Sequence, residues 1–413
     1  MGLTDADRAL LDSIDARGSA LVERAVGWCA IASGSRNLTG LKTQRAALAD
    51  AFAVLPGELE EAPLAPTVEI DGHGRETSLA HPPAIRLTVR PEAPVQVVLT
   101  GHYDTVFPEG SSFSTVAARA DGALNGPGIA DMKGGLSVML GALEAFEAHG
   151  EAARLGYRVL ISPDEELGSP GSAALLADLG RHGHVGLTYE PALGDGALAA
   201  ARKASGNFHV LVTGRAAHAG RDFASGRNAM AAAARIGAAL DAINGRGEGV
   251  TVNLARIEGG APSNVVPDVA VIRFNARAPD AAAQAWAETE IARALQAGAG
   301  DGIAIRRLGG FTRPPKPFNA AQQGLFEAVR ATGALIGQDI AWKPSGGVCE
   351  GNNLFAAGLP NADSLGVRGG DIHSEQEHAW PDSFPERARL SALILMRLAR
   401  GEIDGPALRA AMV

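Results

Sequence analysis

The segment VQVVLTGHYD, residues 95–104, decides the fold class of this chain. Its first half is a near-continuous apolar run, which is typical of a strand buried on both faces of a parallel sheet. Two ionisable residues, His102 and Asp104, follow this run directly. Because open α/β sheets place their ligand-binding groups beyond the carboxyl ends of the strands, we expect both side chains at a functional rim of the sheet.

Two further apolar runs repeat this pattern. The strands predicted at Tyr157–Ser162 and Val185–Tyr189 are followed by Glu165 with Glu166, and by Glu190, respectively. Helical patterns occur between the strands, at Gly134–His149 and Ser172–Leu179. Strands that alternate with helices predict an α/β domain with a mixed, mostly parallel sheet and helices on both of its faces.

The pattern changes near Arg202. Six elements follow in the order β-α-β-β-α-β, which is the order of a ferredoxin-like α+β unit. They are predicted at Asn207–Thr213, Asn228–Ile243, Thr251–Ile257, Val269–Ala276, Ala281–Leu295 and Ile303–Leu308. A proline-rich segment at residues 313–317 ends this unit. We therefore expect a larger α/β domain of residues 1–202 and 314–413, interrupted by a smaller domain of residues 203–313.

The composition narrows the range of functions. A chain of 413 residues with 46% hydrophobic residues can form a large core, and its length favours two or three domains. The net charge of −9, with both signs interspersed, argues against nucleic acid as the main partner. Two cysteines argue against a disulfide framework. The first 32 residues show no signal-peptide pattern, and no apolar run approaches the roughly 20 residues that cross a bilayer, so we expect a cytoplasmic protein.

Two more segments extend the set of ionisable residues. Asp131 lies in GIADMKGG, residues 128–135, and His373 lies in DIHS, residues 371–374. A single carboxylate after a strand is usually a helix cap or a solvated turn residue, but capping does not require two histidines. Histidines together with several carboxylates form the ligand set of a borderline metal that binds nitrogen and oxygen. The set therefore predicts two metal ions and a hydrolytic water.

The chemistry of the side chains suggests a role for each of them. His102 and His373 each offer an imidazole nitrogen to a different ion, and Asp131 can bridge both ions because a carboxylate has two oxygens. Glu166 and Glu190 would complete the two sites.

Two residues of the set are then left without a metal to bind. Asp104 can accept the second N–H of His102 and thereby orient its ring. Glu165 can take a proton from the hydrolytic water and pass it to a leaving amine.

These segments resemble the co-catalytic dizinc peptidase family that contains glutamate carboxypeptidase, acetylornithine deacetylase, succinyl-diaminopimelate desuccinylase and aminoacylases. The resemblance spans His102 to His373 and implies two Zn²⁺ ions per subunit. It implies one site of His102, Asp131 and Glu190 and another of Asp131, Glu166 and His373, with a cis peptide bond after Asp131. Co²⁺ and Mn²⁺ stay open as alternatives, because nitrogen and oxygen ligands do not select zinc. A glutamate at position 190, in the segment YEP, resembles the glutamate carboxypeptidase branch.

The resemblance extends to the smaller domain, which it implies is a lid and a dimerisation domain. In the family, the histidine at the position of His218 reaches the active site of the partner subunit, where it would stabilise the oxyanion. Asn264 resembles a substrate-contacting residue, and Arg313 resembles the arginine that binds the substrate carboxylate. Arg277 ends an apolar strand and is either a substrate-binding or a surface charge. The alanine-rich helix predicted at Asn228–Ile243 also favours a homodimer.

One glycine-rich segment departs from the usual family pattern. Gly346 and Gly347 permit a close backbone approach and are candidates for substrate contact. Cys349 follows them where the family more often has an acidic residue or threonine. It is either near the metals or, as the residue type favours, a buried small side chain.

We therefore predict a zinc-dependent hydrolase that cleaves an amide bond next to a free carboxylate, acting as a carboxypeptidase or an N-acyl-amino-acid deacylase. Its substrate would be a small peptide or an N-acyl amino acid. A dipeptidase or aminopeptidase of the same family, and a non-catalytic binding protein on the same fold, are the alternatives.

Overall fold

The computed structural model describes residues 2–412, which fold into two compact units. The larger unit contains residues 2–65, 81–201 and 318–412, and the smaller unit contains residues 66–80 and 202–317. The boundaries drawn from the sequence assigned residues 66–80 to the catalytic domain, whereas the structure places them in the smaller unit.

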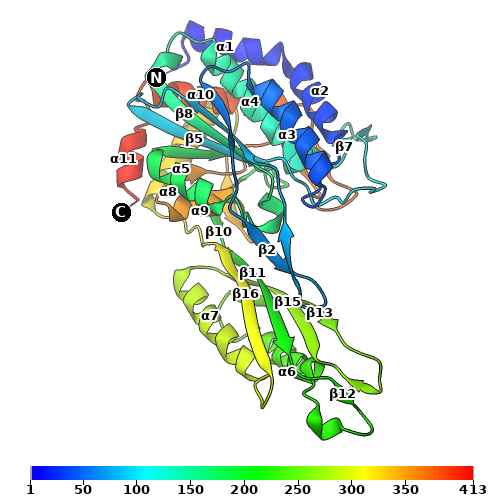
Figure 1. The fold of residues 1–413 in the computed structure, drawn as a ribbon. Coiled ribbons are helices and arrows are strands. Elements are labelled where there is room, and N and C mark those ends of the chain that lie inside the picture. The colour runs from blue at the N-terminus through cyan, green and yellow to red at the C-terminus, as the bar shows by residue number, and fades with distance from the viewer. Residues whose placement is uncertain (1, 413) are drawn as a thin grey trace. The chain divides into compact units, whose positions relative to one another are not determined.

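A six-stranded sheet forms the centre of the larger unit (Figure 1). Its strands, in spatial order, are β1 (Glu58–Ala62), β4 (Ala84–Val89), β8 (Leu155–Ser162), β5 (Val95–His102), β9 (Val185–Thr188) and β18 (Asn361–Ala362). The last four strands run parallel, and β4 and β1 are antiparallel at one edge. The prediction of a mixed, mostly parallel sheet is confirmed.

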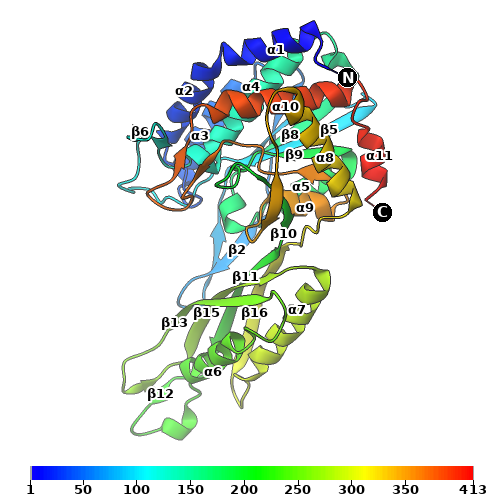
Figure 2. The same cartoon turned by 180° about the vertical axis from the view of Figure 1, so that it is seen from behind.

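Helices cover both faces of this sheet. They are α1 (Asp5–Asp15), α2 (Gly18–Cys29), α3 (Leu38–Phe52), α4 (Gly135–Glu147), α5 (Ala173–His182), α8 (Ala320–Leu335), α9 (Glu350–Ala356), α10 (Ser383–Ala399) and α11 (Gly405–Ala410). Figures 1 and 2 both show α1, α2, α4 and α10 on one side of the sheet and α5 and α9 on the other. Because successive side chains of a strand point to opposite faces, Val97 and Leu99 of β5 join the large core, whereas Val98 joins a smaller cluster with α5 and α9.

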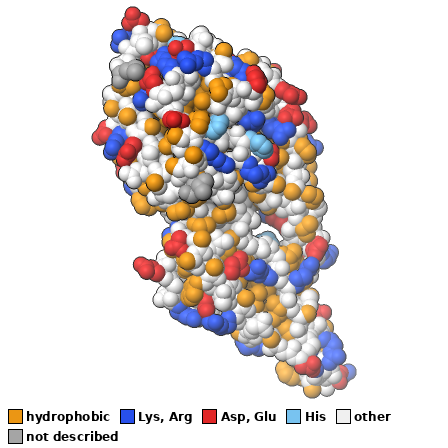
Figure 3. Space-filling model, turned by 90° about the vertical axis from the view of Figure 1, so that its left-hand side faces the viewer, with side chains coloured by type: hydrophobic (Ala, Val, Ile, Leu, Met, Phe, Trp, Pro, Cys, Tyr) orange, Lys and Arg blue, Asp and Glu red, His pale blue; other side chains and the backbone are white. Residues whose placement is uncertain are grey.

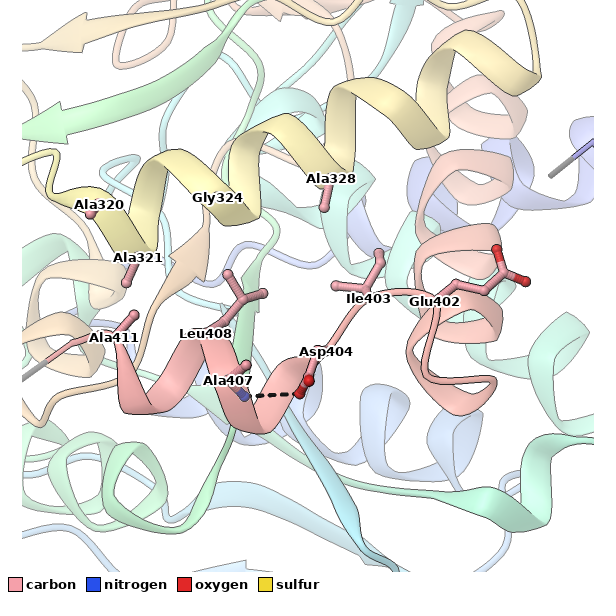
Figure 4. Close-up of a pocket in the computed structure, with 10 residues that line it drawn as sticks. All are labelled: Ala320, Ala321, Gly324, Ala328, Glu402, Ile403, Asp404, Ala407, Leu408 and Ala411. Carbon is pink, nitrogen blue, oxygen red and sulfur yellow. Dashed lines mark hydrogen bonds between the residues drawn. The ribbon is translucent and has the colours of Figure 1, made fainter.

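Short elements complete the larger unit. They are β6 (Ala117–Ala118), β7 (Leu124–Asn125), η1 (Ile129–Gly134), η2 (Ala152–Arg154), η3 (Glu165–Leu167), β10 (Leu198–Arg202), β17 (Trp342–Ser345), β19 (Gly369–Gly370) and β20 (His378–Ala379). A cavity of about 320 Å³ lies between α8 and α11 (Figure 4). Small side chains such as Ala321 and Ala407 line it, and Asp404 beside it caps α11 by accepting the N–H of Ala407 at 2.9 Å. The cavity contains none of the predicted site residues.

The smaller unit has a four-stranded antiparallel sheet in the order β13-β15-β11-β16, with α6 and α7 packed against it (Figure 1). Its elements are β11 (Ala204–Thr213), β12 (Ala217–His218), η4 (Phe223–Ser225), α6 (Ala229–Asp241), β13 (Thr251–Gly259), β14 (Val265–Val266), β15 (Val269–Ala278), α7 (Ala281–Gln296) and β16 (Ala304–Arg313). The β-α-β-β-α-β order is the predicted one. Asn228 and Asp280 cap α6 and α7 by accepting backbone N–H groups.

A hairpin from the N-terminal third of the chain joins this smaller unit. It consists of β2 (Thr67–Ile70) and β3 (Glu76–Leu79). The carbonyl oxygen of Ile70 accepts a hydrogen bond from Arg273, and a Cβ on Gly74 would lie 2.7 Å from the side chain of Leu211. These contacts with β15 and β11 explain why the hairpin belongs to the smaller unit.

The surface carries charges of both signs. Figure 3 shows a face on which Lys and Arg side chains are interspersed with Asp and Glu side chains and with uncharged ones. Among residues 2–412, no helix combines the length and the apolar character that a membrane span requires.

Candidate metal centre

Three parallel strands bring ionisable residues to one end of the sheet in the larger unit. β5 ends at His102, which pairs in register with Ser162 at the end of β8. Glu165 and Glu166 lie in η3, directly after β8, and Glu190 follows β9. Since β5, β8 and β9 are adjacent and parallel, their carboxyl ends present these residues at one edge.

Asp131 reaches this edge from the turn η1, which precedes α4. The peptide bond between Asp131 and Met132 is cis, as the resemblance predicts. A Cβ on Gly135 would lie only 2.0 Å from the carbonyl oxygen of Tyr189. Glycine is therefore required where the start of α4 packs against the segment that carries Glu190.

The predicted ligands form two groups that share Asp131. In the first group, His102 Nε2 lies 3.2 Å from Asp131 Oδ1 and 3.9 Å from Glu190 Oε1. In the second group, His373 Nε2 lies 3.2 Å from Asp131 Oδ2 and 3.2 Å from Glu166 Oε2. Asp131 thus turns a different oxygen toward each imidazole, which is the geometry that a bridging carboxylate needs.

This donor set fits a pair of divalent cations. The side chains of Asp131, Glu166 and Glu190 are largely buried, at 7%, 6% and 11% exposure. Buried carboxylates this close together repel one another unless positive charge lies nearby. Two divalent ions supply more positive charge than two protonated imidazoles do. Each group offers one nitrogen and two carboxylates, which leaves coordination positions for water and substrate, as in catalytic zinc sites. The residues present therefore fit the implied metals.

Asp104 contacts both His102 and the loop that carries the two glutamates. His102 Nδ1 lies 3.0 Å from the carbonyl oxygen of Asp104 and 3.3 Å from its Oδ1. The Asp104 carboxylate also accepts the backbone N–H groups of Glu165 and Glu166, each at 3.2 Å. The Ser35 hydroxyl donates to it at 2.8 Å. Asp104 therefore fixes η3 as well as the imidazole, and the contact from Ser35 was not predicted.

Glu165 belongs to neither ligand group found among the described residues, and its side chain is half-buried. Its backbone is fixed on both sides. Asp104 accepts its N–H, and buried Asp164 accepts the N–H groups of Gly171 and Ser172 and the hydroxyl of Ser172 at 2.6–3.1 Å. The position is thus rigid and free of the ligand role, as a general base requires.

Glu377 is a second residue that sequence reasoning missed. It is 1% exposed, and its carboxylate accepts three backbone N–H groups from the segment that ends at Asp131. The only sequence signal is an acidic residue four positions after His373, and that spacing alone does not predict a contact with residues 128–131.

In the metal-free protein, the two histidines hold protons tightly. Hydrogen bonds to Asp131 and Glu166 raise the pKa of His373 to about 11. Burial lowers the pKa of His102, but its contacts with Asp104 and Asp131 outweigh burial and raise that pKa well above 6.5. Burial and the neighbouring Asp131 raise the pKa of Glu166 to about 8. A metal ion must displace these protons to bind.

In the smaller unit, the structure brings His218 and Asn264 together. β12 pairs with β14, and the N–H of Ala219 donates to the carbonyl oxygen of Asn264 at 2.9 Å. His218 is exposed, and its Nδ1 accepts the N–H groups of Gly220 and Arg221, each at 3.1 Å. Because Nδ1 is an acceptor, the proton of the neutral ring lies on Nε2, which can donate a hydrogen bond outward.

The two predicted substrate arginines flank one residue of the same sheet. Ser205 of β11 pairs with Arg277 on β15 and with Arg313 on β16. Directly opposite residues of antiparallel strands place their side chains on the same face. Arg313 is only 1% exposed, whereas Arg277 is partly exposed and donates to Asn275 at 3.2 Å. Substrate binding by either arginine stays a prediction.

The glycine-rich segment lies between β17 and α9. A Cβ on Gly346 would meet no heavy atom within 4 Å, so packing within the chain does not explain the glycine there. Gly347 is exposed and donates its N–H to Ser345. Cys349 is fully buried, as its residue type favours. Its thiol also forms hydrogen bonds: it donates to Asp363 Oδ2 at 2.9 Å and accepts the N–H of Gly351 at the start of α9.

Several known proteins are similar to this chain in sequence. Carboxypeptidase G2 from Pseudomonas sp. (strain RS-16) is 28% identical over 318 residues, which cover 74% of each chain. An N-acetyl-L-citrulline deacetylase from Xanthomonas campestris is 29% identical over 186 residues, 43% of this chain and 48% of that protein.

Solved structures show the same fold. The metallo-carboxypeptidase Sso-CP2 from Sulfolobus solfataricus matches with a TM-score of 0.69 at 14% identity, covering 91% of this chain and 98% of that chain. Human carnosine dipeptidase 1 matches with a TM-score of 0.70 at 17% identity, covering 95% and 100%. The model of peptidase family M20/M25/M40 matches residues 98–397, which are more than half of the chain. The chain therefore belongs to peptidase family M20/M25/M40.

Proposed function

We propose that this hydrolase cleaves an amide bond next to a free carboxylate, as a carboxypeptidase acting on small peptides or as a deacylase acting on N-acyl amino acids. The observation that carries the proposal is the pair of ligand groups that share Asp131, with Glu165 beside them but in neither group. We propose two Zn²⁺ ions, the first held by His102, Asp131 and Glu190 and the second by Asp131, Glu166 and His373. Co²⁺ and Mn²⁺ are alternatives for the same ligands.

Different residues of the chain then have different roles in hydrolysis. When bound, the two cations would acidify water and polarise the scissile carbonyl. The Glu165 carboxylate takes a proton from the attacking water and delivers it to the nitrogen of the departing amine. Asp104 holds the His102 ring and the backbone of Glu165 in fixed positions.

Residues of the smaller unit would recognise the substrate. His218 Nε2–H donates to the developing oxyanion, and Asn264 contacts the substrate from the turn that precedes β14. Arg277 and Arg313 bind the free carboxylate, a task for which a guanidinium offers two parallel donors. We propose that the chain forms a homodimer in which His218 acts in the partner's site, with residues 203–313 as the dimerisation and lid domain and the cytoplasm as its location.

The 28% identity to carboxypeptidase G2, over 74% of both chains, supports the carboxypeptidase branch. The test is a hydrolysis screen of N-acyl amino acids and dipeptides, with zinc or cobalt supplied and with the C-terminus either free or blocked. We expect cleavage only of substrates with a free C-terminal carboxylate. Cleavage of C-blocked but not N-blocked dipeptides would reject the proposal in favour of an aminopeptidase.

The role of Glu165 is tested by Glu165→Gln. The variant should bind metal and fold normally, but it should lose roughly 10²–10⁴-fold in kcat because general-base catalysis is removed. Glu109→Gln makes the same exchange on an exposed loop of the same unit and should keep full activity. A Glu165→Gln variant with wild-type activity would contradict the assignment of Glu165 as the general base.

A further inference from the structure

The hairpin formed by β19 and β20 carries His373 in its loop and Glu377 at its end. The strands pair through Gly369 with Ala379 and through Gly370 with His378. Within the loop, the Ser374 hydroxyl donates to the carbonyl oxygen of Asp371 at 2.7 Å, and the N–H of Glu377 donates to the carbonyl oxygen of Ser374 at 3.1 Å. His373 and Glu377 are therefore parts of one compact loop.

Glu377 joins this loop to the segment that carries Asp131. Its Oε1 accepts the N–H groups of Ala130 and of Asp131 itself, both at 3.0 Å, and its Oε2 accepts the N–H of Gly128 at 3.2 Å. Its own backbone is held in turn, because its carbonyl oxygen accepts the N–H of Gly126 at 3.1 Å and the side-chain amide of Asn125 at 2.7 Å. Glu377 thus makes five hydrogen bonds with one strand-and-turn segment.

We propose that Glu377 is a positioning residue that holds the bridging carboxylate of Asp131 at a fixed place relative to His373. Asp131 is the one ligand that both groups share, so a shift of its backbone disturbs both metal sites at once. Three backbone N–H groups fixed by a buried carboxylate leave that backbone little freedom. Because His373 lies on the same loop as Glu377, the contact sets the separation of two ligands and not only the place of one. This inference rests on the proposed dinuclear site.

The exchange Glu377→Gln isolates this function. The glutamine side chain keeps one acceptor oxygen but turns an NH₂ group toward a backbone N–H. In at least one of the three contacts, two donors then face each other and the hydrogen bond is lost. Mutation of a residue that holds a metal ligand in place typically lowers metal affinity by roughly 10–100-fold. We expect Glu377→Gln to lower the affinity for both ions by a factor of that size. Glu377→Asp keeps the charge on a shorter side chain and should restore part of the affinity.

The measurement is calorimetric titration of the metal-free protein with Zn²⁺, with folding checked by circular dichroism. Glu375→Gln is the matched control: it removes the same charge from the same loop, where Glu375 is exposed and contacts the Ser112 hydroxyl at 3.4 Å. We expect Glu377→Gln to bind both ions more weakly than Glu375→Gln does, and Glu377→Asp to lie between the two. Equal affinities in Glu377→Gln and Glu375→Gln would overturn the role of Glu377. Absence of zinc binding in the wild type would instead reject the dinuclear site itself.

Discussion

Replacing Asp104 by asparagine removes one oxygen acceptor from a buried site where every acceptor is used. The carboxylate is 0% exposed, and it faces Ser35, His102 Nδ1 and the backbone N–H groups of Glu165 and Glu166. Each oxygen accepts one of the two backbone N–H groups. Whichever way the new amide is turned, its NH₂ therefore faces at least one N–H donor.

The size of the effect follows from this one lost contact. A hydrogen bond to a charged group contributes about 1.5–3 kcal/mol, and we expect the Asp104→Asn variant to lose about that much in its free energy of unfolding. Because the same contact orients Glu165, kcat/KM should fall by roughly 10–100-fold, as for other partners of metal ligands. Asp178→Asn, an exposed exchange on α5, should cost less than about 0.5 kcal/mol and leave activity unchanged.

Urea unfolding of the metal-free proteins measures the predicted loss of stability, and steady-state hydrolysis measures the predicted loss of kcat/KM. A variant that loses activity without losing stability would show that Asp104 acts on His102 alone. Wild-type stability together with wild-type kcat/KM would refute the reasoning.

Three further predictions follow from the site. Because hydrogen bonds to Asp131 and Glu166 raise the pKa of His373 to about 11 in the metal-free protein, its ring is protonated at pH 7. Zinc binding should therefore release protons and weaken as the pH falls; calorimetry in buffers of different ionisation enthalpy measures this, and release of no protons would contradict it. Co-expression of Glu165→Ala and His218→Ala chains should restore activity that neither variant has alone, because only the mixed dimer pairs an intact Glu165 with an intact His218; no restoration would place His218 outside the partner's site. Arg277→Met should raise KM for substrates with a free carboxylate without changing kcat, and an unchanged KM would leave Arg277 as a surface charge.

The sequence predicts the parts of the fold in which burial follows from local pattern. β5 and β9 are buried on both faces, and their sequences are therefore largely apolar. Ionisable residues follow both strands, at the edge where open α/β sheets place their ligand-binding groups. The hairpin of β2 and β3 has no such pattern: most of its residues are exposed or half-buried, and it is held through contacts with distant strands. Its place in the smaller unit could not be inferred from the sequence.

The members of the two candidate ligand groups could be predicted from the sequence for a chemical reason, whereas the residues that support them could not. Histidine and carboxylate side chains are the groups that bind a metal, and they stand out at the ends of strands. Glu377 and Ser35 act on backbone N–H groups and on another carboxylate, and these partners become neighbours only after folding. A buried carboxylate that accepts backbone N–H groups has no residue pattern of its own, so only the structure identifies it.

The most direct test of the central claim is the stoichiometry of metal binding by the purified, metal-free chain. Titration with Zn²⁺, followed by elemental analysis after gel filtration, should give two ions per chain, and Asp131→Asn should lose both because both ligand groups use that residue. A chain that retains one ion or none, or an Asp131→Asn variant that still binds two, would contradict the account of a dinuclear site bridged by Asp131.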